Sequence, residues 1–348
     1  MATTPLRPVN PLTISDWDRR LLQDFPSATI FHTAAWARVL ANTYGYTPLY
    51  FRAGDPDKPT ALLPLMEVDS WLTGRRGVSL PFTDECEPFC ANAELFQALS
   101  DTVLTLGRER GWKYWESRGG QPTIPGARAS TIFWGHRIDL QRDQAAIFDN
   151  LDDATRRAVR KAGKSDLTIE FSRELPAVRA FHELLIRTRR RHGVPVQPFA
   201  FFQNIQRHVL APNHGQVILA RHQGVPVAGA VFLHYGRTAL YKFGASDERQ
   251  QQLRANNRVM WEAIGHYAGG GYASLDFGRT SLGNEGLRRF KLGWGASERQ
   301  IEYFRHDFRT GGAVSVPDGS SGWHHRVFRL LPAFLSRLIG ALLYKHIA

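Results

Sequence analysis

The sequence predicts a mixed α/β protein of two domains, and three observations support this class. The chain has 348 residues, enough for two domains of ordinary size that each bury their own core. Hydrophobic residues make up 43% of the chain and charged residues 22%, the proportions of a folded globular protein. Stretches with helical spacing alternate with short apolar stretches bounded by glycine or proline, which indicates alternating helices and strands. We expect domains at residues 1–150 and 151–312, followed by a C-terminal segment at 313–348.

The first domain is expected to begin with a helix and to continue with strands. Trp36, Val39 and Leu40 recur at helical spacing, and Gly111 ends a later helical stretch. A turn rich in proline and glycine separates two apolar stretches, as in a hairpin. The expected elements are, in order, a helix over 31–43, strands over 48–52 and 60–68, a helix over 91–110 and a strand over 112–117.

The second domain repeats this alternation with clearer boundaries. Gly163 and Gly193 end two helical stretches, and the turn 222–224 joins two strongly apolar stretches. The expected elements are a basic helix over 151–162, a strand over 167–171, a helix over 176–191, strands over 215–221, 225–234 and 238–244, a helix over 254–268, a strand over 272–277 and a loop over 278–284. This order is typical of an acyltransferase α/β domain.

Composition limits the function classes. Lys and Arg outnumber Asp and Glu by 44 to 32, and the formal charge of +12 favours anionic partners such as phosphates, RNA or acidic lipid. Cys86 and Cys90 have neither the number nor the spacing of a zinc site or a disulfide scaffold, so we expect two reduced thiols and no metal. Hydrolase, zinc-protease and nucleotide-loop motifs do not occur. Without a secretory signal or a long uncharged apolar stretch, we expect a cytoplasmic protein.

The C-terminal segment has a composition of its own. Residues 323–348 contain four Arg or Lys residues and no acid, and their leucines and isoleucines fall mostly on one side of a helix. A basic amphipathic helix of this kind binds in a membrane interface or packs on the protein or a second subunit. Both alternatives remain open, so localisation is expected to be cytoplasmic, with or without attachment to the inner membrane.

The densest group of chemically active residues is 275–295, which combines glycines, two acids, hydroxyls and four basic residues after a strand. Here the chain resembles the FemAB family of peptidoglycan-bridge aminoacyltransferases and its GNAT-like relatives, including those encoded with exosortase and exopolysaccharide systems. The matching pieces are Asp276-Phe-Gly278, Gly286-Leu-Arg-Arg-Phe-Lys291, Trp294-Gly295, Tyr241-Lys-Phe-Gly-Ala-Ser246, Asn256-Asn257 with Trp261, and Thr155-Arg-Arg-Ala-Val-Arg-Lys-Ala162.

The resemblance implies two tandem GNAT-like domains, with the active site in the second, and acyl or aminoacyl transfer to an amine. Lys291 is at the family's Phe-Lys position, where an ammonium can hold substrate charge and stabilise the oxyanion. Asp276 is expected to orient the attacking amine or accept its proton. Arg189, Arg190 and Arg191 resemble the family's acceptor-binding turn, with Arg191 as a phosphate clamp. A surface lysine, a capping acid and solvated arginines are the corresponding structural alternatives.

Further substrate-binding candidates lie in the other matching pieces: Lys242, Asn256, Asn257, Arg279 and Arg288. In GNAT enzymes the loop equivalent to 246–254 and the following helix start bind the donor pyrophosphate. This loop lacks glycine at 247–254, which favours aminoacyl-tRNA over acyl-CoA as the donor.

The expected partners are a phosphate-bearing donor, either tRNA or CoA, a lipid- or nucleotide-linked envelope precursor and an anionic membrane surface, but not DNA. Two rivals remain open: an acyl-CoA-dependent N-acetyltransferase of polysaccharide biosynthesis, and a non-catalytic adaptor that binds membrane or RNA.

Overall fold

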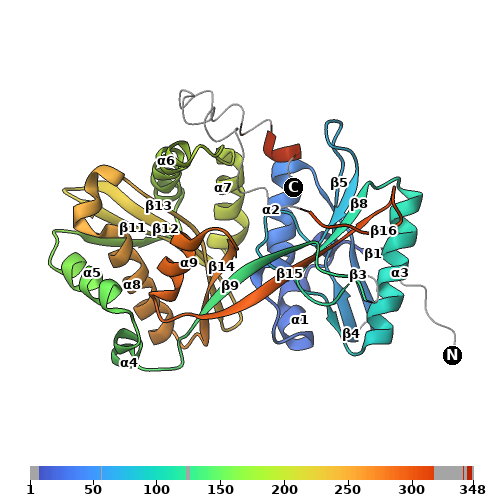
Figure 1. Cartoon of the computed structure of the whole chain (residues 1–348), viewed down its shortest axis with the longest axis horizontal. Helices are drawn as coiled ribbons and strands as arrows, with labels where there is room; N and C mark the ends of the chain where they lie inside the picture. The colour runs from blue at the N-terminus through green and yellow to red at the C-terminus, as the bar shows by residue number, and fades with distance from the viewer. Residues whose placement is uncertain (1–7, 56, 123–125, 317–339, 341–342, 347–348) are drawn as a thin grey trace. The chain divides into compact units, whose positions relative to one another are not determined.

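The structure is a computed structural model that describes residues 8–55, 57–122, 126–316, 340 and 343–346 (Figure 1). Helices alternate with strands in it, so the mixed α/β class is confirmed. No helix in this described part is long and apolar enough to cross a bilayer. Most of the amphipathic helix expected over 323–348 lies outside the described residues, and Tyr344–His346 form a short 3-10 turn, η5.

Backbone contacts divide the chain into two compact units. The first contains the described residues up to Phe133, those from Gln300 to Val316, and 343–346, while the second contains those from Trp134 to Arg299 and residue 340. These limits differ from the boundaries expected at residues 150 and 312. The reason is that strands β9 (Thr131–Asp139) and β15 (Ser297–Asp307) each contribute residues to both units.

The first unit has two groups of paired strands. The first group is antiparallel, in the order β1-β3-β4-β7. The second group has the order β15-β8-β6-β5-β2. Its elements are β1 (Pro8–Val9), η1 (Pro11–Thr13), α1 (Trp17–Asp24), η2 (Ile30–His32), α2 (Ala34–Tyr44), β2 (Thr47–Pro48), β3 (Tyr50–Asp55), β4 (Lys58–Leu63), β5 (Met66–Val68), β6 (Arg76–Val78), β7 (Phe89–Cys90), α3 (Ala93–Glu109), β8 (Tyr114–Arg118) and β16 (Gly312–Ala313).

One expected strand of this unit is two strands in the structure. The stretch 60–68 divides into β4 and β5, which pair in different sheets. Pro64 lies between them and has no N–H to donate to a ladder, so the pairing of β4 does not continue into β5. Helix α3 matches the expected helix closely and buries Phe96, Leu99 and Val103 in the core of the unit.

The second unit is one mixed sheet with helices on both faces. The strand order is β10-β11-β12-β13-β14-β9-β15, with β13 and β14 parallel. Its elements are α4 (Gln144–Asp149), α5 (Asp153–Gly163), β10 (Thr168–Ser172), α6 (Leu175–His192), α7 (Phe199–Ile205), η3 (Gln206–Leu210), β11 (Gly215–His222), β12 (Val225–Tyr235), β13 (Thr238–Ser246), η4 (Glu248–Leu253), α8 (Ala255–Gly269), β14 (Ser274–Ser281) and α9 (Glu285–Leu292).

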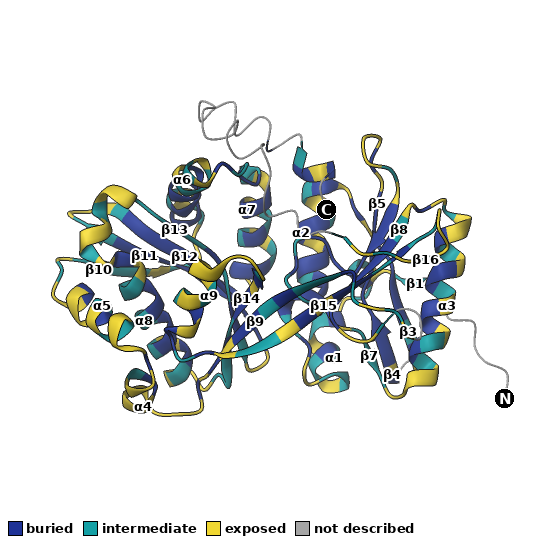
Figure 2. Cartoon of the chain, in the orientation of Figure 1, coloured by how far each residue is buried: buried dark blue, intermediate teal, exposed yellow. Residues whose placement is uncertain are grey.

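The two-residue period of β12 places α6 and α8 on opposite faces of this sheet. Ala230 and Phe232 join the core cluster that contains Ile264 of α8. Gly229 precedes Ala230 and faces the opposite side, where an added Cβ would lie 3.4 Å from Phe181 of α6. The burial pattern in Figure 2 agrees, because the inner strands are buried and the outer turns of α5 and α6 are exposed.

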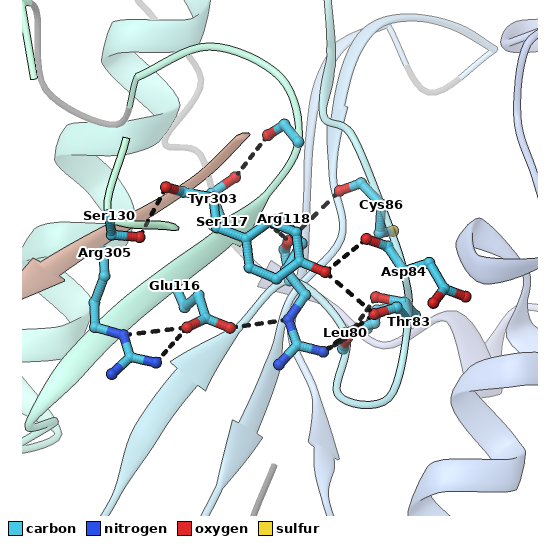
Figure 3. Close-up of polar contacts among 12 residues, drawn as sticks. Leu80, Thr83, Asp84, Cys86, Glu116, Ser117, Arg118, Ser130, Tyr303 and Arg305 are labelled. Atoms are coloured by element: carbon cyan, nitrogen blue, oxygen red, sulfur yellow. Dashed lines mark hydrogen bonds and ion pairs between the residues drawn. The ribbon is translucent and has the colours of Figure 1, made fainter. Parts of the chain in front are cut away.

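A charged network is buried inside the first unit (Figure 3). The Glu116 carboxylate is 6% exposed and accepts hydrogen bonds from the guanidinium groups of Arg118, at 2.9 Å, and Arg305. Arg118 also donates to the carbonyls of Leu80 and Thr83. Burial opposes ionisation of Glu116, but the two arginines outweigh it and lower its pKa to about 2.

We predict that Glu116→Gln lowers the free energy of unfolding by about 3 kcal/mol at neutral pH, because it leaves two arginines without their carboxylate. The pKa of Glu116 falls from 4.5 to about 2 on folding, so the ion pairs stabilise the protein fully above pH 4.5. That contribution disappears as the pH falls toward 2. Urea unfolding of both proteins across this range should therefore show a difference that shrinks with acidification.

Asp57→Asn provides the control, since Asp57 pairs with Arg20 at 3.0 Å but its side chain is 89% exposed. Its urea midpoint should stay near that of the wild type. Equal destabilisation by the two variants would contradict a special role for the buried network.

Candidate active site

The parallel strands β13 and β14 pair over only three residues each, from Thr238 opposite Ser274 to Leu240 opposite Asp276. Both strands then continue, β13 to Ser246 and β14 to Ser281. On its other side β13 remains paired with β12 as far as Ser246. The backbone groups of β13 beyond Leu240 therefore do not pair with β14, and those of Ser246 bond to Thr188 instead. In open α/β sheets, ligands bind at the carboxyl ends of strands at such divisions.

A β-bulge at Lys242 accompanies the end of this pairing. Tyr241 is opposite Phe232 and Phe243 is opposite Val231, so Lys242 is the extra residue of β13. The Lys242 side chain is half-buried, with Nζ 5.6 Å from the Phe243 ring centroid. At Gly244 an added Cβ would lie 1.7 Å from the Tyr241 hydroxyl, so this close approach needs glycine. The Tyr-Lys-Phe-Gly piece thus determines the local shape of the strand.

A pocket of about 640 Å³ lies at the carboxyl end of β13. Four arginines and two acids contribute to its lining, so its formal charge is +2: Arg187, Arg190, Arg191, Ser246, Asp247, Glu248 and Arg249. The three α6 arginines come from the last turns of the helix, before Gly193 ends it with φ of +67°. Excess positive charge in a concave site favours an anionic ligand.

The two acids of this pocket hold the arginines in place. Asp247 lies 3.6 Å from Arg187, and Glu248 lies 3.4 Å from Arg191. A hydrogen bond from Arg249 is the main cause that lowers the pKa of Asp247 to about 2, so this carboxylate is ionised at neutral pH. Arg191 was predicted from the sequence and lines the pocket, whereas Arg189 is half-buried and does not line it.

Helix α8 begins beside the same strand end. Asn256 donates from Nδ2 to the Ser246 hydroxyl at 3.0 Å, and Ser246 also exchanges hydrogen bonds with Thr188. Arg254, with φ of +52°, precedes the helix and gives it no side-chain cap. The N-terminus of α8 therefore keeps backbone donors and a partial positive charge for an anion. Asn257 is half-buried in this first turn.

On the β14 side, Lys291 and Asp276 both bind the backbone around Gly278. Lys291 is 2% exposed, and its Nζ donates to the carbonyls of Gly278, at 2.9 Å, and Arg279, at 3.0 Å. Asp276 accepts from the Gly278 N–H at 2.7 Å and lies 3.4 Å from Arg137. Gly278 itself has φ of +66°. These contacts fix the direction of β14 beyond its pairing with β13.

A buried histidine next to this group was not predicted. His136 of β9 is 1% exposed, its Nε2 lies 3.0 Å from Glu298, and its Nδ1 has no partner among the described residues. Burial and the charge of Lys291 lower the pKa of His136, which keeps the ring neutral. Only a lone histidine between glycine and arginine marks it in the sequence. The strand that contains His136 was not predicted from the sequence, so nothing placed this histidine near the site.

The two remaining predicted residues differ in their contacts. Arg288 donates through Nε and Nη2 to both oxygens of Glu298 at 2.8 Å, and its guanidinium lies 4.7 Å from the Trp134 ring centroid. Arg279 is exposed on β14. Four of the predicted residues thus lie in two groups, with Arg191 and Asn256 at the anionic pocket and Lys291 and Asp276 around Gly278.

Comparison with known proteins agrees with this geometry. Residues 153–305 match the acetyltransferase (GNAT) domain family. The fold is similar to that of FemX, with a TM-score of 0.67 and 13% identity over 82% of this chain and 94% of FemX. No curated protein matches the chain in sequence.

Two further solved structures share the fold. The C-terminal domain of a putative lysylphosphatidylglycerol synthetase from Agrobacterium fabrum matches with a TM-score of 0.52 and 14% identity over 92% of this chain and 95% of that domain. L-PGS from Bacillus licheniformis matches with a TM-score of 0.50 and 12% identity over 84% of this chain and 89% of that protein. The chain is therefore an acyltransferase with the fold of FemX, and its residues 153–305 are a GNAT domain.

Proposed function

We propose that this acyltransferase moves an aminoacyl or acyl group from a phosphate-bearing donor to an amine of a cell-envelope precursor, in peptidoglycan or exopolysaccharide assembly. The observation that carries the proposal is the arginine-lined pocket at the end of β13 in a GNAT domain. The FemX-like fold and the FemAB-type motifs around Lys291 support an envelope acceptor.

In the proposed reaction, the acceptor amine attacks the donor carbonyl, the tetrahedral oxyanion forms, and the bond to the leaving oxygen or sulfur breaks. The amine loses one proton and the leaving group gains one. Backbone N–H groups of β13 beyond the Lys242 bulge are suited to stabilise the oxyanion, since β14 does not pair with them. Asp276, half-buried and 3.4 Å from Arg137, is the proposed proton acceptor.

Lys291 has an indirect role in this proposal. Its Nζ donates to the carbonyls of Gly278 and Arg279, so it orients the segment that carries Asp276. Lys291 is thus a positioning residue here, in place of the direct contact with substrate expected from the sequence.

Aminoacyl-tRNA and acyl-CoA both remain candidate donors. The loop before α8 forms η4 and contains no glycine, which favours the aminoacyl-tRNA reading. An uncapped α8 start beside Ser246 suits the pyrophosphate of CoA, and this favours an N-acetyltransferase of polysaccharide biosynthesis as the second candidate. Isothermal titration separates them, because micromolar binding of CoA without binding of charged tRNA would select the second.

The acceptor is tested by mass spectrometry of lipid-linked envelope precursors from cells with and without the gene. We expect a mass difference equal to one acyl or aminoacyl group on an amine. Identical precursor masses, with acyl transfer still measured on another amine, would overturn the envelope assignment.

Charge in the pocket should govern donor binding. We predict that Arg190→Gln with Arg191→Gln weakens donor binding about tenfold, because charge-assisted hydrogen bonds to phosphate are lost. The loss should diminish at high salt. Titration calorimetry with the donor measures it.

Arg142→Gln is the matched control, because Arg142 is an exposed arginine of the same unit that does not line the pocket. It should bind the donor like the wild type. If both variants lost affinity equally, only the net charge of the protein would matter, and the pocket would not be the donor site.

Loss of the carboxylate charge should slow chemistry without weakening donor binding. We predict that Asp276→Asn lowers kcat about a hundredfold, since an amide cannot take the proton while its oxygen still accepts from Gly278. Single-turnover kinetics and donor titration together check this.

Arg137→Gln tests whether the ion pair alone matters, because it removes the partner at 3.4 Å and keeps the carboxylate. Its kcat should fall only severalfold. An Asp276→Asn enzyme with full kcat would contradict the assigned role.

A further inference from the structure

The turn between β5 and β6 exposes two neighbouring large hydrophobic side chains. Trp71 is 87% exposed and Leu72 is 51% exposed. Among the described residues no other pair of exposed large hydrophobic side chains is consecutive, and no other such side chain is as exposed as Trp71. The turn that follows β5 is correspondingly exposed in Figure 2. An exposed tryptophan beside a leucine marks an interaction site more often than a scattered single residue does.

This turn is held in one conformation by its own hydrogen bonds. The Gly74 N–H donates to the Ser70 carbonyl at 2.7 Å, and the Thr73 N–H donates to the Ser70 hydroxyl at 3.0 Å. Buried Arg76 donates to Thr73 Oγ1 at 2.7 Å and to the Gly74 carbonyl at 3.1 Å. Trp71 and Leu72 are therefore presented on a rigid base.

The C-terminal turn η5 binds to the same base. The His346 ring lies 2.8 Å from the Ser70 hydroxyl, and the His346 carbonyl accepts from Arg76 at 2.9 Å. The Trp71 and His346 rings meet edge to face at 5.6 Å. Yet Trp71 remains 87% exposed, so this contact covers little of it.

Exposed basic residues lie close to this turn. Lys113 lies over Gly74, where a Cβ would be 2.3 Å from its Cε, and is exposed. Exposed Lys345 precedes the His346 that contacts Trp71. Arg75 is 43% exposed and pairs with Asp69 at 2.8 Å. Tryptophan prefers the membrane interface, and lysine and arginine around it attract anionic headgroups.

We propose that the Trp71–Leu72 turn is a membrane-docking site that inserts into the interface of an anionic lipid surface. The turn is rigid, apolar at its tip and basic at its sides, which is the chemistry that such a surface binds. Membrane binding and packing on the protein were both left open for the C-terminal segment, and this inference does not depend on that segment. It assigns contact with lipid to a hairpin of the first unit and is independent of the acyl-transfer chemistry.

Vesicle co-sedimentation of the full chain tests the site. We expect the wild type to bind vesicles of phosphatidylcholine with phosphatidylglycerol and to bind pure phosphatidylcholine weakly. Trp71→Ser with Leu72→Ser should reduce binding about tenfold. Lys113→Gln with Lys345→Gln should reduce only the phosphatidylglycerol-dependent, salt-sensitive part. Trp71→Phe should retain most of the binding.

Val225→Ser is the control, since Val225 is 59% exposed on another hairpin turn. It should bind vesicles like the wild type. Circular dichroism should show that all variants are folded.

Wild-type protein that binds neither vesicle, or a serine double variant that binds as the wild type does, overturns the docking site. Either result leaves donor binding and acyl transfer in solution untouched, so failure here is distinct from failure of the proposed function. Dimerisation through this turn would appear as self-association that the serine variant abolishes, without vesicle binding, and would also overturn it.

Discussion

The divergence of β13 from β14 is the constraint on which the rest of the site depends. The two strands pair through only three residues, and different devices hold them apart beyond that point. On β13 the extra residue Lys242 changes the register against β12. On β14 the positive φ of Gly278 turns the backbone, and Lys291 and Asp276 bind the peptide groups on either side of it. As a result, backbone groups of β13 that a continuous sheet would pair with β14 are not paired with it.

The anionic pocket follows from this divergence and from the direction of two helices. The carboxyl end of β13, the last turns of α6 and the first turn of α8 meet at Ser246, which bonds to Thr188 and Asn256. A helix C-terminus would repel an anion, so the arginines of α6 are needed there to reverse the local sign. Asp247 and Glu248 keep these long side chains ordered, and the lining remains at +2.

Ionic groups have a different role in the first unit. Glu116 is shared by Arg118 and Arg305, and Arg118 reaches on to the carbonyl of Leu80, a residue with φ of +42°. Burial of these charges is tolerated because each has partners. The network connects β8, β15 and the 80–86 loop, so it fixes an irregular segment that apolar packing alone would leave poorly determined.

Regular elements of the fold could be predicted from the sequence, and its irregular connections could not. Helix α6 was expected over 176–191 and spans Leu175–His192, because a clear apolar spacing ends at Gly193. Helix α9 was missed because its eight residues hold charges and glycine, and only Lys291 is buried. Strand β15 was missed because only three of its residues, Ile301, Tyr303 and Phe304, are large and apolar.

The candidate site was predicted in its parts but not in its arrangement. The motif residues Lys291, Asp276 and Arg191 could be selected from their sequence context. That Lys291 binds the backbone carbonyls of Gly278 and Arg279, and that Arg187 and Arg249 come together to complete the pocket, depends on tertiary contacts. Such contacts leave no local pattern. His136 was not predicted for the same reason, because its partner Glu298 is 162 residues away in the sequence.

Hydrogen–deuterium exchange of the full chain, with and without each donor, tests the central claim most directly. The account predicts that the donor that binds slows exchange of backbone amides over 242–257, where β13 leaves its neighbour and α8 begins. Amides of β10, which lies at the far edge of the same sheet, should be unaffected. Protection confined to other segments, while 242–257 exchanges as in the free protein, would contradict a donor site at the divergence of β13 and β14.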